Sequence, residues 1–325
     1  MAIDVAEVKR RLVTLLGDVN VVNEYIRQFG PAIDMKHIKA IKENRLRSVR
    51  VIEEGVGDDP LFELMLECPV CGRKDIPSYE LRAKSQAITQ NKFLVPIYQG
   101  ASGFKTVDYT MLGVTVCPRC LFASPDKKDF NRAAVNHGPE TKTQLLSNVL
   151  MTLQEKIGER KALMKSVTNF EEYFKRPRID EAAIMSYRLA VSRASVEAWY
   201  EQPYSLYKQG AYTLKIAKIL KDGGNDNAKV LRETLEFFEE AFRTSNCPSE
   251  EIEMQVVYTI VALNIKLGDC KKGNSFIGVF SNLHNSRATE MKTNPKLNLM
   301  TIDKWADKAN RLWEDREDPD VFKNE

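Results

Sequence analysis

The spacing of apolar residues in the last two thirds of the chain predicts α-helices. From about residue 141 these residues recur every three or four positions, as they do on one face of an amphipathic helix. The first such stripe contains Leu146, Leu150, Leu153 and Ile157. It predicts one long helix over residues 141–165.

Further helices are expected to begin near residues 181, 204, 226 and 249, a step of about 22 residues that suits stacked helical hairpins. A plain helical bundle is the alternative. Ser249 is expected to cap the fourth of these helices. We expect the stripe from Phe276 to Leu283 to form a shorter helix, and a last helix to bury Ile302, Trp305, Ala309 and Leu312. Aromatic residues on these stripes, Trp199 included, are expected in the core.

The first 60 residues also show helical spacing. Val8, Leu12 and Leu15 predict a helix that ends near Gly17, and a second helix from Val22 to Phe29 should stop at Gly30. The next segment, Lys36–Arg50, is basic on one face and apolar on the other. Such a helix suits contact with nucleic acid or acidic lipid, or it is the solvated outer face of a small helical domain.

Between these helical regions the pattern changes to a period of two, which is typical of strands. Residues 61–67 alternate in this way, and residues 111–116 and 92–98 are also strand-like. The first two stretches each run into a cysteine pair. We expect them to pair with each other and so to bring the two cysteine pairs together.

The cysteine pairs are the most specific chemical signal in the chain. They read Cys68-Pro69-Val70-Cys71 and Cys117-Pro118-Arg119-Cys120. Two Cys-x-x-Cys pairs are the usual spacing of a four-thiolate zinc site, so Cys68, Cys71, Cys117 and Cys120 are the predicted zinc ligands. A redox or disulfide pair and an iron–sulfur cluster are the alternatives. Four cysteine ligands leave no open coordination position, which favours a structural Zn2+ over a catalytic one.

The turn after each pair gives a further expectation. Gly72 follows the first pair and tolerates the left-handed backbone that such a turn needs. Leu121 stands at the equivalent place after the second pair, which puts the turn geometry there in question.

This arrangement resembles a bacterial family of uncharacterised proteins, a domain of unknown function. The resemblance lies in the strand into Cys68-Pro69-Val70-Cys71, the long insertion, and Val116-Cys117-Pro118-Arg119-Cys120 followed by Phe122-Ala123 and Phe130. The stretches Arg178–Ala183 and Ser186–Ala190 are similar to the first helix of that family. The resemblance covers residues 62–245. It implies a zinc ribbon followed by a tetratricopeptide-like helical region.

Composition excludes several classes of protein. The net charge of +3 is too small to indicate nucleic-acid binding by itself, and no apolar run is long enough for a transmembrane helix. The first residues lack the apolar core of a signal peptide. Six cysteines without such a peptide indicate a reducing, cytoplasmic location, in which Cys247 and Cys270 are thiols without a role.

The expected fold is therefore α+β and mainly α, with three parts: an N-terminal helical segment (1–60), a zinc-ribbon module (61–135) and a helical repeat-like domain (136–325). No recognised catalytic motif is present, so we expect a non-enzymatic adaptor that binds a protein partner or a second copy.

Two alternatives remain open for this chain. The first is a nucleic-acid-binding regulator that uses the basic segment Lys36–Arg50. Further basic residues that could contact phosphate, or that are simply solvated, are Arg73, Lys74, Arg82, Lys84 and Arg119 and the tetrad Lys175–Arg178. The second is an enzyme that uses polar residues near the zinc module: Asp108, Tyr109, His137 and Glu140.

Overall fold

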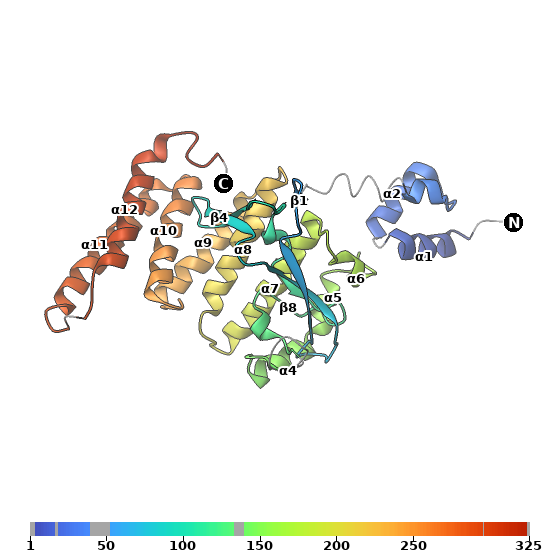
Figure 1. Ribbon diagram of the computed structural model, residues 1–325, viewed down its shortest axis with the longest axis horizontal. Coiled ribbons are helices and arrows are strands. Elements are labelled where there is room, and N and C mark those ends of the chain that lie inside the picture. The colour runs from blue at the N-terminus through green and yellow to red at the C-terminus, as the bar shows by residue number, and fades with distance from the viewer. Residues whose placement is uncertain (1–3, 17–18, 40–52, 133–139, 295, 324–325) are drawn as a thin grey trace. The chain divides into compact units, whose positions relative to one another are not determined.

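The computed structural model describes residues 4–16, 19–39, 53–132, 140–294 and 296–323 (Figure 1). The chain divides into two compact units. Residues 1–87 and 99–190 form the first, and residues 88–98 and 191–325 form the second. Most described residues lie in helices, and the strands form small two-stranded pairs, so the fold is α+β and mainly α. Within the described ranges, no helix combines the length and the apolar character needed to cross a membrane.

The first two helices form as predicted, and they pack against each other. They are α1 (Val5–Leu16) and α2 (Val19–Phe29), and their shared apolar cluster includes Leu12, Val22 and Tyr25. α2 ends at Gly30, whose φ of 77° suits glycine. Residues 35–39 are helical, but the rest of the predicted basic helix, residues 40–50, lies outside the described residues.

Four two-stranded sheets follow: β1 (Glu53–Glu54) with β6 (Thr106–Val107), β2 (Leu61–Leu66) with β3 (Ile76–Leu81), β4 (Gln86–Gln90) with β5 (Pro96–Gly100), and β7 (Thr115–Val116) with β8 (Ala123–Ser124). The strand predicted over 61–67 is β2. Its predicted partner is wrong, because β2 pairs with β3 in antiparallel register, Leu61 opposite Leu81.

Two other strand predictions were too long or shifted. Within residues 111–116 a 3-10 helix, η1 (Tyr109–Met111), ends at the start of the segment, and only Thr115–Val116 form a strand. The strand expected over 92–98 begins at Pro96, because the Asn91 side chain accepts the amides of Phe93 and Val95 and holds the preceding residues in a turn.

The long helix predicted over 141–165 is two short helices, α4 (Ser147–Glu155) and α5 (Ile157–Ala162). Lys156 between them has φ −84° and ψ 16°, which breaks the helix, and Gly158 weakens helix propensity just after it. The buried face of α4 is Val149, Thr152 and Leu153, whereas Leu146 is 47% exposed. A short helix, α6 (Phe170–Tyr173), follows.

The remaining helices begin close to the predicted places. They are α7 (Asp180–Trp199), α8 (Ser205–Asp222), α9 (Ala228–Arg243), α10 (Glu250–Lys266), α11 (Cys270–Glu290) and α12 (Met300–Glu314). From α8 onward each helix packs against the next, and α12 also packs against α10. α10 is accordingly buried on most of its circumference. Ser249 caps α10 as predicted, with its hydroxyl accepting the Ile252 amide at 3.3 Å.

Two expectations for this region were wrong. α11 has 21 residues and is not short. The apolar stripe underestimated its length because polar residues such as Ser281 and Asn285 occupy the exposed face of the helix. Trp199 is not in the core but 69% exposed, because it is the last residue of α7. The stripe of α12 is buried as predicted, at Ile302, Trp305, Ala309 and Leu312.

Candidate metal centre

Each cysteine pair lies in the turn of its own hairpin. The first pair connects β2 to β3. There the amide of Cys68 donates to the Arg73 carbonyl at 2.8 Å, and the amide of Gly72 donates to the Cys68 carbonyl at 2.9 Å. These bonds curl the backbone so that both sulfurs project to one side.

The second pair connects β7 to β8 and repeats the same bonds. The amide of Cys117 donates to the Phe122 carbonyl at 2.8 Å, and the amide of Leu121 donates to the Cys117 carbonyl at 2.8 Å. Leu121 has a φ of 59° and Gly72 one of 69°. The leucine therefore adopts the left-handed conformation that glycine adopts in the first turn, and the two turns are equivalent.

The two hairpins meet through β3 and β7. The hydroxyls of Ser78 on β3 and Thr115 on β7 share a buried hydrogen bond of 2.6 Å. This contact, rather than the expected pairing of the strands that enter the two turns, brings the cysteine pairs together.

The four sulfurs converge on one point. Their Sγ atoms all lie within 4.8 Å of one another, with 3.5 Å between Cys68 and Cys120 and 3.6 Å between Cys71 and Cys117. A tetrahedral zinc with bonds of about 2.3 Å separates its sulfurs by about 3.8 Å, so the spacing fits zinc. None of the four is in a disulfide. The predicted ligand set is therefore a potential metal site compatible with zinc.

Burial strengthens the case for a cation at this point. Cys68, Cys117 and Cys120 are at most 1% exposed, and Cys71 is half-buried. Hydrogen bonding to Cys117 and Cys120, with burial, raises the pKa of the Cys68 thiol. Hydrogen bonds from Cys120 and Cys68 lower the pKa of Cys117 to about 2. The cluster stabilises the thiolate of one cysteine and opposes the ionisation of another. A bound cation is therefore needed for all four thiols to ionise.

Arg160 on α5 fixes the second turn to the helices beside it. It is 2% exposed, its Nε donates to the Cys120 carbonyl at 3.1 Å, and its Nη2 donates to the Leu153 carbonyl at 2.7 Å. Sequence analysis did not single out this residue, because its only signal was a charged position within an apolar stripe. Buried carbonyls that would otherwise lack partners explain why an arginine is stable there.

The basic tetrad is a loop before α7, as expected, but two of its residues are engaged within the protein. Arg176 forms ion pairs with Glu53 at 2.7 Å and with Asp59 at 2.6 Å. Arg178 is 3% exposed and donates to the carbonyls of Phe174, Met111 and Val114, at 3.0 to 3.3 Å. Neither guanidinium is solvated at the protein surface.

The other basic residues near the two cysteine turns either hydrogen-bond within the protein or lie at its surface. Arg73 pairs with Glu171 at 2.6 Å, and the Arg82 Nε donates to the Asp59 carbonyl at 3.2 Å. The rest are at the surface: Lys74, Lys84 and Arg119.

The polar residues considered for an enzyme do not form a catalytic group in the part of the chain that is described. Asp108 caps η1 by accepting the Thr110 amide, and the Tyr109 hydroxyl donates to the Tyr79 carbonyl at 2.7 Å. Glu140 is exposed, and His137 lies outside the described residues.

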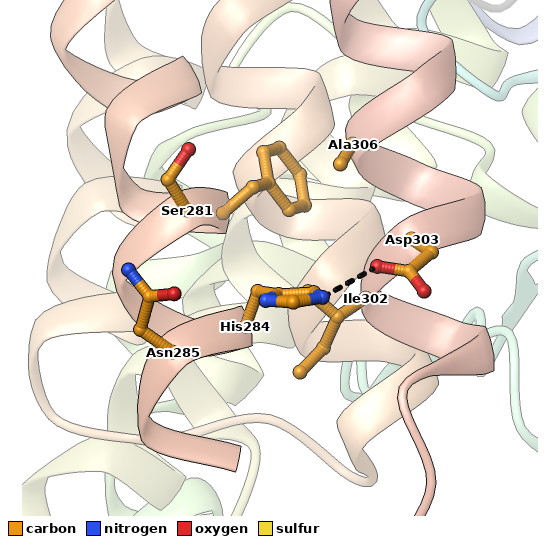
Figure 2. Close-up of a pocket in the computed structure, with 7 residues that line it drawn as sticks. Ser281, His284, Asn285, Ile302, Asp303 and Ala306 are labelled. Atoms are coloured by element: carbon orange, nitrogen blue, oxygen red, sulfur yellow. Dashed lines mark ion pairs between the residues drawn. The ribbon is translucent and has the colours of Figure 1, made fainter. Parts of the chain in front are cut away.

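A second group of polar residues, not predicted, lines a pocket of about 310 Å3 between α11 and α12 (Figure 2). His284 and Asp303 face each other, with 3.6 Å between Nε2 and Oδ1. Ser281 lies one turn before His284, but Figure 2 shows its hydroxyl directed away from the imidazole. The three residues therefore do not form a serine–histidine–aspartate triad.

Comparison with known proteins identifies the family of the chain. A family model described as "Uncharacterized protein conserved in bacteria (DUF2225)" matches residues 61–307, which include both cysteine pairs and most of the later helices. No match was found among curated proteins or among solved structures.

Proposed function

The chain belongs to this bacterial family, and from that premise we propose that it is a cytoplasmic, non-enzymatic adaptor built around a structural zinc ion. In this proposal the zinc-ribbon segment (61–135) joins the N-terminal helices (1–60) to a helical scaffold (136–325). The scaffold binds a protein partner or a second copy of the chain.

The observation that carries the proposal is the closed set of four clustered sulfurs, three of which belong to buried cysteines. Zinc held by four thiolates has no position left for water or substrate, so it stabilises the fold and does not activate a nucleophile. Binding energies of about 10–16 kcal/mol at such sites are comparable with the stability of a whole domain. The ion would therefore hold the two hairpins in place.

The scaffold part of the proposal is a tetratricopeptide-like arrangement of α7 to α12. It is supported by the packing of consecutive helices from α8 to α12 and by the close approach of α8 and α9, where the Phe238 ring occupies the space that a Cβ of Gly210 would need. Stacked helices of this kind present extended surfaces to protein partners.

The experiment compares Cys71→Ser with Cys247→Ser in the full chain. Zinc content is measured by mass spectrometry of the metal, and partners are identified by crosslinking in cells followed by light scattering of the purified complex. We expect about one zinc per chain in the wild type and in Cys247→Ser, loss of zinc in Cys71→Ser, and loss of the partner with it. A metal-free wild type, or a monomer that captures no partner, would refute the adaptor.

A nucleic-acid-binding regulator is the second candidate. The observation in its favour is that Lys36 and Lys39 are exposed where the basic helix begins. Binding to DNA or RNA should then weaken steeply as salt rises, because bound phosphates release counterions. The absence of any binding at low salt would exclude this function.

A further inference from the structure

A pocket of about 510 Å3 lies beside the metal centre, within the first compact unit. Its walls come from β3, from α6 and from the outer side of both cysteine turns, which contribute Arg73 and Pro118. This volume lies within the range of about 300–1,000 Å3 that is typical of small-molecule sites.

The buried part of the lining is apolar apart from one cation. Tyr79, Val116, Phe174 and Arg178 are each less than 9% exposed, and no carboxylate among the described lining residues is buried to this degree. Glu63 and Asp75 are exposed, and the side chains of Glu171 and Glu172 are 63% and 73% exposed. The acids therefore belong to the rim of the pocket and not to its floor.

Among the residues that the structure describes, no acid pairs with the positive charge at the floor. Arg178 hydrogen-bonds to three backbone carbonyls and to the Ser186 hydroxyl, all of them neutral groups. Burial lowers the pKa of Arg178 to about 10, so the guanidinium is still charged at neutral pH. A buried charge in this state favours an anion nearby.

Two further donors line the same pocket. The Nε of Arg73 is buried and has no hydrogen-bond partner among the described residues, although its Nη2 pairs with Glu171. Burial raises the pKa of Tyr79 against a hydrogen bond from the Arg176 backbone, so the hydroxyl keeps its hydrogen and can donate it to an anion. The Arg73 Nε is thus a buried donor without an acceptor, which is unfavourable unless a ligand or water satisfies it.

We propose that this pocket binds a small organic anion, with a carboxylate or phosphate group near Arg73, Tyr79 and Arg178 and a flat apolar body against Phe170 and Phe174. The anion satisfies the donors and the buried charge, and the aromatic rings remove the apolar body from water. This ligand site goes beyond the adaptor function and does not depend on it.

The test measures binding to the zinc-loaded full chain by titration calorimetry with four probes of defined chemistry: benzoate, phenyl phosphate, inorganic phosphate and benzylamine. We expect whichever of benzoate and phenyl phosphate binds more tightly to have a Kd of about 1 mM or lower, an affinity that a ligand of this size can reach. Inorganic phosphate and benzylamine should bind at least about tenfold more weakly than this anion. Whichever aromatic anion binds better identifies the head group.

The variant Tyr79→Phe removes one hydroxyl and should weaken that anion about five- to tenfold, the effect of one hydrogen bond to a charged group. The control Tyr204→Phe makes the same change at an exposed position outside the pocket and should bind like the wild type. Zinc content confirms that both variants are folded. No saturable binding of either aromatic anion, equal binding of benzylamine, or wild-type binding by Tyr79→Phe would overturn the proposal. None of these results bears on the adaptor, which is tested by metal content and partner capture.

Discussion

Leu121 affects the stability of the second cysteine turn in two opposite ways, through backbone strain and through side-chain burial, and two substitutions separate these effects. Its backbone has a φ of 59°, where a residue with a Cβ is disfavoured by about 1–2 kcal/mol. Its side chain is fully buried, and removal of a buried leucine side chain costs about 3–5 kcal/mol. Burial is the larger effect, so leucine is tolerated at a position where the first turn has Gly72.

The variants Leu121→Ala and Leu121→Gly both remove the buried part of the side chain, and they differ only in the Cβ methyl that alanine keeps. Alanine retains the backbone strain, so we expect a loss of about 3–5 kcal/mol from the free energy of unfolding. Glycine relieves the strain, so we expect a loss of about 2–4 kcal/mol. The glycine variant should therefore be more stable than the alanine variant by about 1 kcal/mol, the reverse of their order in a regular helix or strand.

The assay is native-state hydrogen exchange, measured by mass spectrometry on peptides that cover residues 115–124. Protection of the Leu121 and Phe122 region reports the free energy of opening at this hairpin. Gly72→Ala is the control, because a Cβ there meets nothing within 4 Å and adds only the strain at φ 69°. If Leu121→Ala were as stable as Leu121→Gly, or if the glycine variant were more stable than the wild type, the reasoning would be wrong.

Three further predictions concern the same unit. Arg160→Met leaves two buried carbonyls without donors, so the free energy of unfolding measured by calorimetry should fall by about 2–4 kcal/mol. Lys161→Met changes an exposed neighbour and should alter this free energy by less than about 0.5 kcal/mol. Equal losses in the two variants would refute the role of Arg160. Burial raises the pKa of Asp59, but the hydrogen bonds from Arg176 and the Leu61 amide, with the charges of Arg176 and Lys105, together outweigh it and hold the pKa below its usual value. This stabilisation is present above about pH 4 and is lost as the pH falls through the lowered pKa. Asp59→Asn should therefore flatten the acid side of the stability–pH curve, and an unchanged curve would contradict this. Treatment with a strong zinc chelator should unfold the segment 61–135, seen as rapid hydrogen exchange there, and retained protection would argue against a structural ion.

The sequence predicted which four cysteines cluster into a potential metal site because the signal for it is local. Two residues between cysteines set the geometry of a turn, and a proline after the first cysteine restricts it further. The same applies to Ser249 and to the starts of α7 to α10, where capping and periodicity act within a few residues. These features do not depend on what the rest of the chain packs against.

The errors lie where distant residues compete. The stripe through Leu146 and Leu150 suggested one helix, but α4 turns Val149 and Leu153 inward because that face meets the core. The strand that enters each cysteine turn pairs with the strand that leaves it, because a hairpin closes a shorter loop and loses less chain entropy than the expected long-range pair.

The sequence alone determined which four side chains could hold a metal and that most of the chain would be helical. Tertiary structure decided what the arginines do: Arg160 and Arg178 satisfy backbone carbonyls supplied by segments that sequence spacing does not connect to them. A buried hydrogen bond depends on where its partner lies in the folded chain. The hydrophobic periodicity of the sequence indicates only which side of a helix or strand faces water.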